Sequence, residues 1–211
     1  MHKTARLKPG STAVELDFVD AVHTPTSLME FAIELHLGGL SLSKTVMALE
    51  RFGVSRARST IHNWVLKADL EPRGGCSPEK VALDETVVKI DGEQFWLVGA
   101  VEPSTNRILH VGLYASRNMA MIEFFLDELN QKHDVQDAVF LVDGAPWLHA
   151  ALHRFDLQPR HETFGERNPI ERVFQEIKRR TSQFYNHFGH ANPETVENWL
   201  LALAWAENNL I

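Results

Sequence analysis

The sequence predicts an α/β protein in which a mixed sheet follows a small all-α region. Three observations lead to this fold class. Apolar residues before residue 71 recur at helical spacing, whereas after residue 80 they alternate at strand spacing before helical spacing returns. Between these regions lies EPRGGCSPEK, rich in Pro, Gly and Ser as a linker is. We therefore predict an N-terminal helical region over 1–70, a linker over 71–80 and a second domain over 81–211.

The N-terminal region contains three predicted helices. The first, SLMEFAIELHLGG, ends at its two glycines. Ser41 or Ser43 is expected to cap the second, and Ser55 the third, RARSTIHNWVLKA, after a turn at Gly53. The residues expected to point inward are Leu28, Phe31, Ala32, Leu35, Thr45, Val46, Leu49, Phe52, Ile61, Trp64 and Val65. Two short helices joined by a glycine turn, the second one basic, are typical of a helix-turn-helix.

The domain over 81–211 begins with three predicted antiparallel strands. The first two, VALDETVVKID and QFWLVGAVE, meet at Asp91-Gly92, a pair typical of a tight hairpin, and RILHVGLYA is the third. A helix over MAMIEFFLDELNQKH precedes DAVFLVDGA, whose apolar run predicts a buried parallel strand. Further helices are expected over Pro146–Phe155, Pro169–Phe188, which Asn168 would cap, and Pro193–Asn208. This order predicts a ribonuclease H-like domain, with a mixed sheet and flanking helices.

The composition describes a folded protein with an acidic balance. Of the 211 residues, 44% are hydrophobic and no apolar run is long enough to span a membrane. The N-terminal residues do not resemble a signal peptide, and the single Cys76 excludes an internal disulfide, so we expect a cytoplasmic protein. The formal net charge of −7 is unusual for a protein that binds nucleic acid, yet Arg51–Lys67 contains four basic residues and no acid.

Two aspartates interrupt strands that are otherwise mostly apolar. Asp84 lies in the first strand and Asp143 ends the fourth. Burying a carboxylate is costly unless it is compensated, and two on neighbouring strands would repel each other. A divalent cation removes both difficulties, because Mg²⁺ is held by carboxylates, water and phosphate oxygens. Glu171, in the first turn of a later helix, can supply a third carboxylate, and Lys178 lies two turns further along the same face.

Each of these acids also has a simpler interpretation. Asp84 can bond to a nearby backbone amide, Asp143 can begin a turn at Asp-Gly, and Glu171 can be an ordinary first-turn residue. The strand–strand–helix order, with Lys178 in phase, favours the catalytic interpretation of the three together.

The third predicted helix presents side chains suited to DNA. The residues expected to contact DNA there are Arg56, Arg58, Ser59, Thr60, His62, Asn63 and Lys67. Arg and Asn match the edges of guanine and adenine in the major groove. The alternative is a solvated basic helix that Trp64 packs onto its neighbours.

Four segments resemble insertion-sequence transposases of family six, especially the short versions of halophilic archaea. They are GLSLSKTVMALERFGVSRARSTIHNWV, VALDETVVKIDGEQFWLVGAVE, FLVDGAPW and NPIERVFQEIKRRT, and they extend from about Leu40 to Ser182. The resemblance implies a DDE transposase in which Asp84, Asp143 and Glu171 are catalytic. It implies that these three residues bind two Mg²⁺ or Mn²⁺ ions and that Lys178 assists them.

The resemblance also implies what the protein acts on. The expected partner is double-stranded DNA, both at the element's terminal repeats and at the target, bound by a homodimer or a larger assembly. On the catalytic helix, Arg179 and Arg180 are further expected DNA contacts. Glu171 follows Asp143 by 28 residues, which is short for this motif. Glu176 is nearer the usual spacing, but it points to another side of the helix and has no basic residue seven positions later.

Other interpretations stay open at this point. A transposase-derived regulator without catalysis, or a ribonuclease H-like nuclease, would share the same fold. His149, His153 and His161 have a spacing that can bind zinc, although such pairs are more often structural. Trp96 and Trp147 are expected in the core near the carboxylates, where one of them can alternatively stack on a flipped base.

Overall fold

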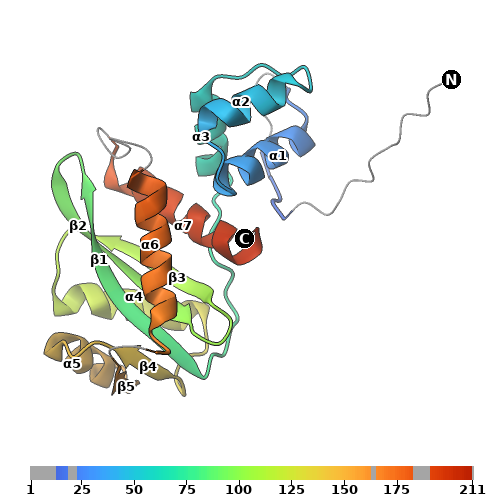
Figure 1. The fold of residues 1–211 in the computed structure, drawn as a ribbon. Helices are drawn as coiled ribbons and strands as arrows, with labels where there is room; N and C mark the ends of the chain where they lie inside the picture. Colours follow the sequence, from blue (N-terminus) through green and yellow to red (C-terminus); the bar gives the residue numbers. More distant parts are fainter. Residues whose placement is uncertain (1–12, 19–22, 163–164, 183–190, 211) are drawn as a thin grey trace. The chain divides into compact units, whose positions relative to one another are not determined.

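The computed structural model describes residues 13–18, 23–162, 165–182 and 191–210. The chain divides into two compact units. The first comprises the residues up to Asp69 and the C-terminal residues from Asn209, and the second spans Leu70–Asn208. Figure 1 shows the helices of the first unit and the sheet of the second. Among the described helices, none combines the length and apolar character needed to cross a membrane.

The first unit contains three helices, as the periodicity predicts. They are α1 (Thr26–Leu37), α2 (Leu42–Glu50) and α3 (Arg58–Lys67). Ser41 caps α2, because its Oγ accepts a hydrogen bond from the Lys44 amide at 3.3 Å. Gly53 turns the chain with a φ of +77°, a conformation that glycine adopts without strain. Buried Ile61, Trp64 and Val65 form the inward face of α3.

Three expectations for this unit are wrong in detail. Phe52 is 58% exposed, although its ring makes an edge contact with Phe31. Ser55 does not cap α3, which begins at Arg58 after an extended Ala57. The buried residues of α1 are Met29, Ala32, Ile33, His36 and Leu37. Leu28 and Leu35 are only half-buried because α1 has apolar residues on two overlapping faces, and packing against α2 and α3 selects one of them.

The second unit is built on a five-stranded mixed sheet with strand order β3-β2-β1-β4-β5. Its strands are β1 (Lys80–Ile90), β2 (Glu93–Glu102), β3 (Arg107–Tyr114), β4 (Val139–Val142) and β5 (Gln158–His161). The first three are antiparallel, whereas β4 is parallel to both β1 and β5. The hairpin at Asp91-Gly92 has positive φ at both residues, as predicted.

Helices cover both faces of this sheet. They are α4 (Met119–Lys132), α5 (Pro146–Arg154), α6 (Asn168–Ser182) and α7 (Pro193–Asn209). On one face, Phe125 of α4 belongs to the same buried cluster as Leu83 and Val98. On the other, α6 crosses β1 and β2 (Figure 1). This arrangement confirms the predicted ribonuclease H-like domain. The end of the helix predicted to reach Phe188 lies outside the described residues.

Two features of this unit were not foreseen. Strand β5 contains Pro159 and little apolar character, so no alternation announces it; as the outermost strand it tolerates proline. The stretch predicted as a linker over 71–80 is hydrogen-bonded within the second unit. The Gly75 amide donates to the Lys132 carbonyl at 2.8 Å, and the Cys76 amide to His133 Nδ1 at 3.2 Å.

Candidate active site

Consecutive acids in β1 face opposite sides of the sheet. Asp84 pairs with Gly99 of β2, and Glu85 pairs with Val98. Because alternate residues of a strand point to opposite faces, Asp84 shares the face of Gly99 and Glu85 shares the face of Val98. Gly99 lies under α6: a Cβ there would come within 2.9 Å of Ile170 Cδ1. Asp84 therefore faces α6, whereas Glu85 faces the core formed with α4.

Asp84 and Asp143 are brought together by the parallel pairing of β1 with β4. This pairing matches Ala82 with Leu141, so Asp84, two residues further along β1, lies near Asp143, which directly follows β4. Burial raises the pKa of the Asp84 carboxyl above its ordinary value, and the negative charge of Asp143 raises it further. The predicted neighbourhood of the two aspartates is therefore present.

Arg167 is the principal partner of Asp84, and sequence reasoning missed it. Its Nη2 lies 2.6 Å from Asp84 Oδ2, and the two side chains are 7% and 17% exposed. The guanidinium acts on the pKa of Asp84 in the direction opposite to burial. Asp84 Oδ1 accepts from the Glu85 amide at 2.9 Å, so the simpler backbone interpretation also holds. No strand or helix periodicity marks Arg167, because it lies in the segment just before α6.

Asp143 follows the last residue of β4 and shapes the turn there. Its Oδ1 accepts a hydrogen bond from the Ala145 amide at 3.1 Å. His149 Nε2 donates to the Asp143 backbone carbonyl at 3.3 Å. The turn interpretation is thus correct for Asp143, and it is compatible with a role as a ligand because a carboxylate accepts several bonds.

The third predicted carboxylate, Glu171, does not join the pair in this structure. It follows Ile170, whose side chain packs over Gly99, but it is exposed. Within the described ranges, no three His, Cys, Asp or Glu side chains form a group suited to one metal ion. Its rival Glu176 is already engaged, accepting from Arg179 Nε at 2.6 Å. The role of Glu171 stays a prediction.

The same finding bears on the zinc alternative. In the part of the chain that the structure describes, His149, His153 and His161 do not gather into a group of three ligands. His149 is instead bonded to the backbone at Asp143.

Beside the aspartates, on the α4 face, a second arginine neutralises Glu85. Arg117, in the turn before α4, forms an ion pair with Glu85. The Arg117 guanidinium carbon lies 4.9 Å from the ring centre of Trp96 and 5.0 Å from that of Trp147. Burial raises the pKa of the Glu85 carboxyl, and Arg117 opposes this shift. Both tryptophans therefore hold an arginine, an arrangement that sequence reasoning did not foresee.

The side chains predicted to contact DNA differ in their exposure. On α3, Arg58, Ser59, Asn63 and Lys67 are exposed, whereas Thr60 and His62 are half-buried. Arg56 lies before α3, and its Nε donates to Thr24 Oγ1 at 2.9 Å. On α6, Lys178 and Arg179 are exposed. Arg180 is only 5% exposed, because α6 turns it inward, so this structure does not present it to DNA.

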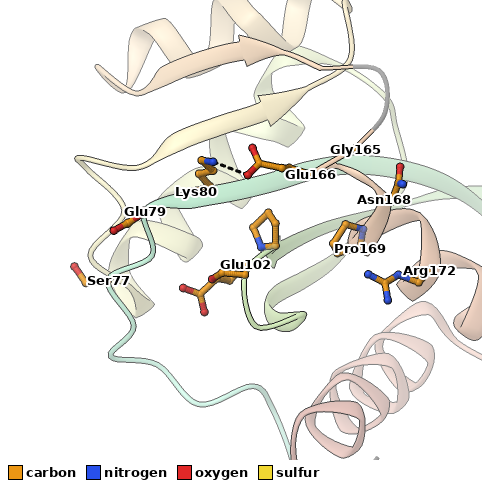
Figure 2. Close-up of a pocket in the computed structure, with 11 residues that line it drawn as sticks. Ser77, Glu79, Lys80, Glu102, Gly165, Glu166, Asn168, Pro169 and Arg172 are labelled. Atoms are coloured by element: carbon orange, nitrogen blue, oxygen red, sulfur yellow. Dashed lines mark hydrogen bonds and ion pairs between the residues drawn. The ribbon is translucent and has the colours of Figure 1, made fainter.

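A cavity of about 740 Å³ lies where β1 and α6 begin (Figure 2). Its charges are mixed: Lys80 and Arg172 line it together with Glu79, Glu102 and Glu166, and Lys80 is paired with Glu166. The other lining residues are Ser77, Pro103, Ser104, Gly165, Asn168 and Pro169. The predicted carboxylates are not among them, and the balanced charges do not favour an anion. We assign this cavity no function.

Comparison with known proteins identifies a family whose model matches this chain. A model of the DDE domain found in IS240-type transposases matches residues 79–191. An uncharacterized protein of Methanocaldococcus jannaschii is 29% identical over 168 residues, which is 79% of this chain and 78% of that protein. An uncharacterized protein of Aquifex aeolicus is 44% identical over 59 residues, 28% of this chain and 49% of that protein.

Solved structures to which the chain is similar include the integrase catalytic core domain of HTLV-2 in complex with magnesium. That domain is 14% identical, with a TM-score of 0.47 over 64% of this chain and 90% of that one. A simian T-cell lymphotropic virus intasome chain is 12% identical, with a TM-score of 0.49 over 85% of this chain and 69% of that one.

Proposed function

We propose a catalytic assignment for this chain, which belongs to the DDE domain family of IS240-type transposases and is a DDE transposase of the polynucleotidyl transferase class. In this assignment Asp84, Asp143 and Glu171 hold the divalent ions. The observation that carries it is the pair of aspartates on neighbouring strands, on the face that α6 covers. The matched family model includes all three positions.

The donor set suits a hard cation. Asp84 and Asp143 offer carboxylate oxygens whose negative charges repel each other where burial weakens solvation. Mg²⁺ and Mn²⁺ prefer such oxygens, and we assign two ions to the site. Glu171 supports the assignment because Ile170, its neighbour, packs directly above the residue paired with Asp84.

The proposed reaction is cleavage of DNA at the element's ends, followed by attack of the freed 3′-hydroxyl on a target phosphodiester. Bound metal supplies Lewis-acid stabilisation of phosphate charge and lowers the pKa of a coordinated water. Asp84 and Asp143 would hold the ions on the α6 face of the sheet, beside the end of β4. Lys178, two turns beyond Glu171 on α6, would hold a phosphate by charge.

The partners belong to the same proposal. We assign α1–α3 as a helix-turn-helix unit that binds the terminal repeats of double-stranded DNA. A homodimer or larger assembly would bring two ends together, in the cytoplasm. In α3 the exposed Arg58 and Asn63 are the side chains placed to reach bases, while Lys67 would contact the backbone.

The decisive experiment is a Mg²⁺-dependent joining assay with DNA carrying the element's ends. We expect Asp84→Asn, Asp143→Asn and Glu171→Gln each to reduce joining by at least about a thousandfold, because each removes a negative ligand. DNA binding by gel shift should stay within about twofold of the wild type.

Glu176→Gln is the matched control, because it alters an acid of the same helix and should leave joining nearly unchanged. Loss of joining in Glu176→Gln with retention in Glu171→Gln would show that Glu176, and not Glu171, is the third carboxylate. Retention in Asp84→Asn would refute the assignment.

The proposed DNA surface has its own test. Arg58→Ala should weaken binding to the terminal repeat by about tenfold and, if it contacts a phosphate, reduce the salt slope by about one. Arg154→Ala provides the control, since that exposed arginine on α5 is paired with Glu123. Equal effects of both substitutions on binding would remove α3 from the interface.

A further inference from the structure

Arg167 is a buried arginine of the second unit whose guanidinium contacts the Asp84 carboxylate. It is 6% exposed, and its Nη2 lies 2.6 Å from Asp84 Oδ2. Its Nε is buried and, among the described residues, has no hydrogen-bond partner. Asp84 is the one ion-pair partner found for its guanidinium in the described ranges. A buried cation with an unsatisfied donor is costly, so this position calls for a specific explanation.

We propose that Arg167 is an internal cation that occupies Asp84 in the metal-free protein and is displaced when the divalent ion binds. This inference rests on the proposed function, because it requires Asp84 to be a metal ligand. Asp84 Oδ2 is the atom that Arg167 contacts, and Oδ1 already accepts from the Glu85 amide. A cation at Asp84 would therefore face a like charge at contact distance unless the arginine moved.

The position of Arg167 in the chain suits such an exchange. It lies immediately before α6, four residues ahead of Glu171. Within the described ranges, Asp84 is the one ion-pair partner of its guanidinium, so displacement would break a single ion pair. A movement of Arg167 away from Asp84 also acts on the first turn of α6, the turn that carries Glu171. The exchange thus links metal binding to the position of the third carboxylate.

The proposed role and a purely structural role of Arg167 predict opposite changes in metal affinity when the arginine is removed. If Arg167 only supported the site, its removal would weaken metal binding. An arginine that competes with metal for Asp84 leaves metal binding stronger when removed, while the metal-free protein becomes less stable. The two effects come from the same ion pair, because Arg167 balances the charge of Asp84 only while no ion does.

Mn²⁺ binding to the full chain, measured by calorimetry and by electron paramagnetic resonance without DNA, tests the exchange. We expect Arg167→Gln to bind Mn²⁺ about tenfold more tightly than the wild type. The matched control, Arg160→Gln, removes a nearby exposed arginine paired with Glu162 and Glu166, and it should leave affinity unchanged. Unchanged or weaker Mn²⁺ binding in Arg167→Gln would overturn the proposal.

Thermal unfolding supplies a second readout. Arg167→Gln should unfold at a lower temperature than the wild type in EDTA, and saturating Mn²⁺ should close the gap. A gap of the same size in both conditions would show a structural role and overturn the exchange. If Arg167→Gln does not fold, Arg167→Lys carries the same test, because the ammonium keeps the charge but loses the planar fork. It should show a smaller gain in affinity, and no gain would overturn the proposal.

Asp84→Asn separates this inference from the proposed function. If Asp84→Asn binds Mn²⁺ as the wild type does, the metal assignment itself fails. If Asp84→Asn loses Mn²⁺ binding while Arg167→Gln is unchanged, the assignment stands and only the exchange fails.

Discussion

The two faces of the sheet treat neighbouring acids of β1 in different ways. On the α6 face, Asp84 pairs with buried Arg167, whose Nε has no hydrogen-bond partner among the residues that the structure describes. On the α4 face, Glu85 meets Arg117, which is 41% exposed and lies against two tryptophan rings. In the described part of the chain, the first arginine has a single ion-pair contact and is suited to exchange. The second arginine has three contacts, an ion pair and two tryptophan rings, and is suited to a permanent structural role. The comparison teaches that the partners of an acid in a strand decide whether it is free to bind another cation.

The largest effect is expected from a substitution beneath α6, the helix that covers Asp84. A Cβ at Gly99 would lie 2.9 Å from Ile170 Cδ1 and 3.2 Å from Phe174 Cε1, so Gly99→Ala should push α6 outward. A displacement of Glu171 by about 1 Å can lower the joining rate by about a hundredfold. The flexible side-chain ends should limit the loss of unfolding free energy to about 1 kcal/mol.

Gly112→Ala is the matched control for the other face. Gly112 pairs with Val98, and its added Cβ would lie 2.7 Å from Tyr114 Oη. We expect a similar loss of stability, measured by urea unfolding, with joining unaffected beyond about twofold. Equal losses of joining in the two variants would abolish the distinction between the faces.

Removal of Arg117 should show the structural nature of the α4 face. Arg117→Ala leaves the nearly buried Glu85 carboxylate without its cation and both indole rings without their guanidinium. Because Arg117 is partly exposed, we expect the unfolding free energy to fall by about 2 kcal/mol. Arg154→Ala, which breaks an exposed ion pair, should cost no more than about 0.5 kcal/mol. An Arg117→Ala protein of full stability that cannot join DNA would place Glu85 in the active site.

The smallest expected effect is a pH dependence that belongs to the α4 side. His110 contacts Phe125 of α4, and His133 follows the same helix. Burial lowers the pKa of both imidazoles below the ordinary value of 6.5, and for His110 it outweighs the bond to Glu128. As the pH falls below 6.5, the unfolded chain takes up these protons before the folded one does, so stability is lost.

Urea unfolding between pH 7.5 and about pH 5 measures this slope. We expect His133→Gln to reduce the slope of the unfolding free energy with pH. Stability that stays level or rises over this interval in the wild type would contradict the expectation.

Local patterns predicted much of the fold. The Asp91-Gly92 turn, the Ser41 cap, the alternating strands and α7 each follow from residues close together in the chain, because hydrogen bonding and side-chain period act over a few residues. Strand β5 escaped prediction, since its short, proline-containing run carries no period and exists only because β4 offers it an edge. The inward face of α1 was misplaced for a related reason, since packing chose between two apolar stripes.

For the candidate site, the sequence by itself determined that Asp84 and Asp143 are anomalous, because an acid in an apolar strand must be compensated by something. The phase of Glu171 with Lys178 and the family resemblance add these two residues as predictions. Only the tertiary structure decided which groups balance the negative charges. Parallel pairing of β1 with β4 sets the two aspartates together, and the chain then returns Arg167 to one face and Arg117 to the other. Such charge partners come from distant segments, so strand register and helix packing, not local pattern, select them.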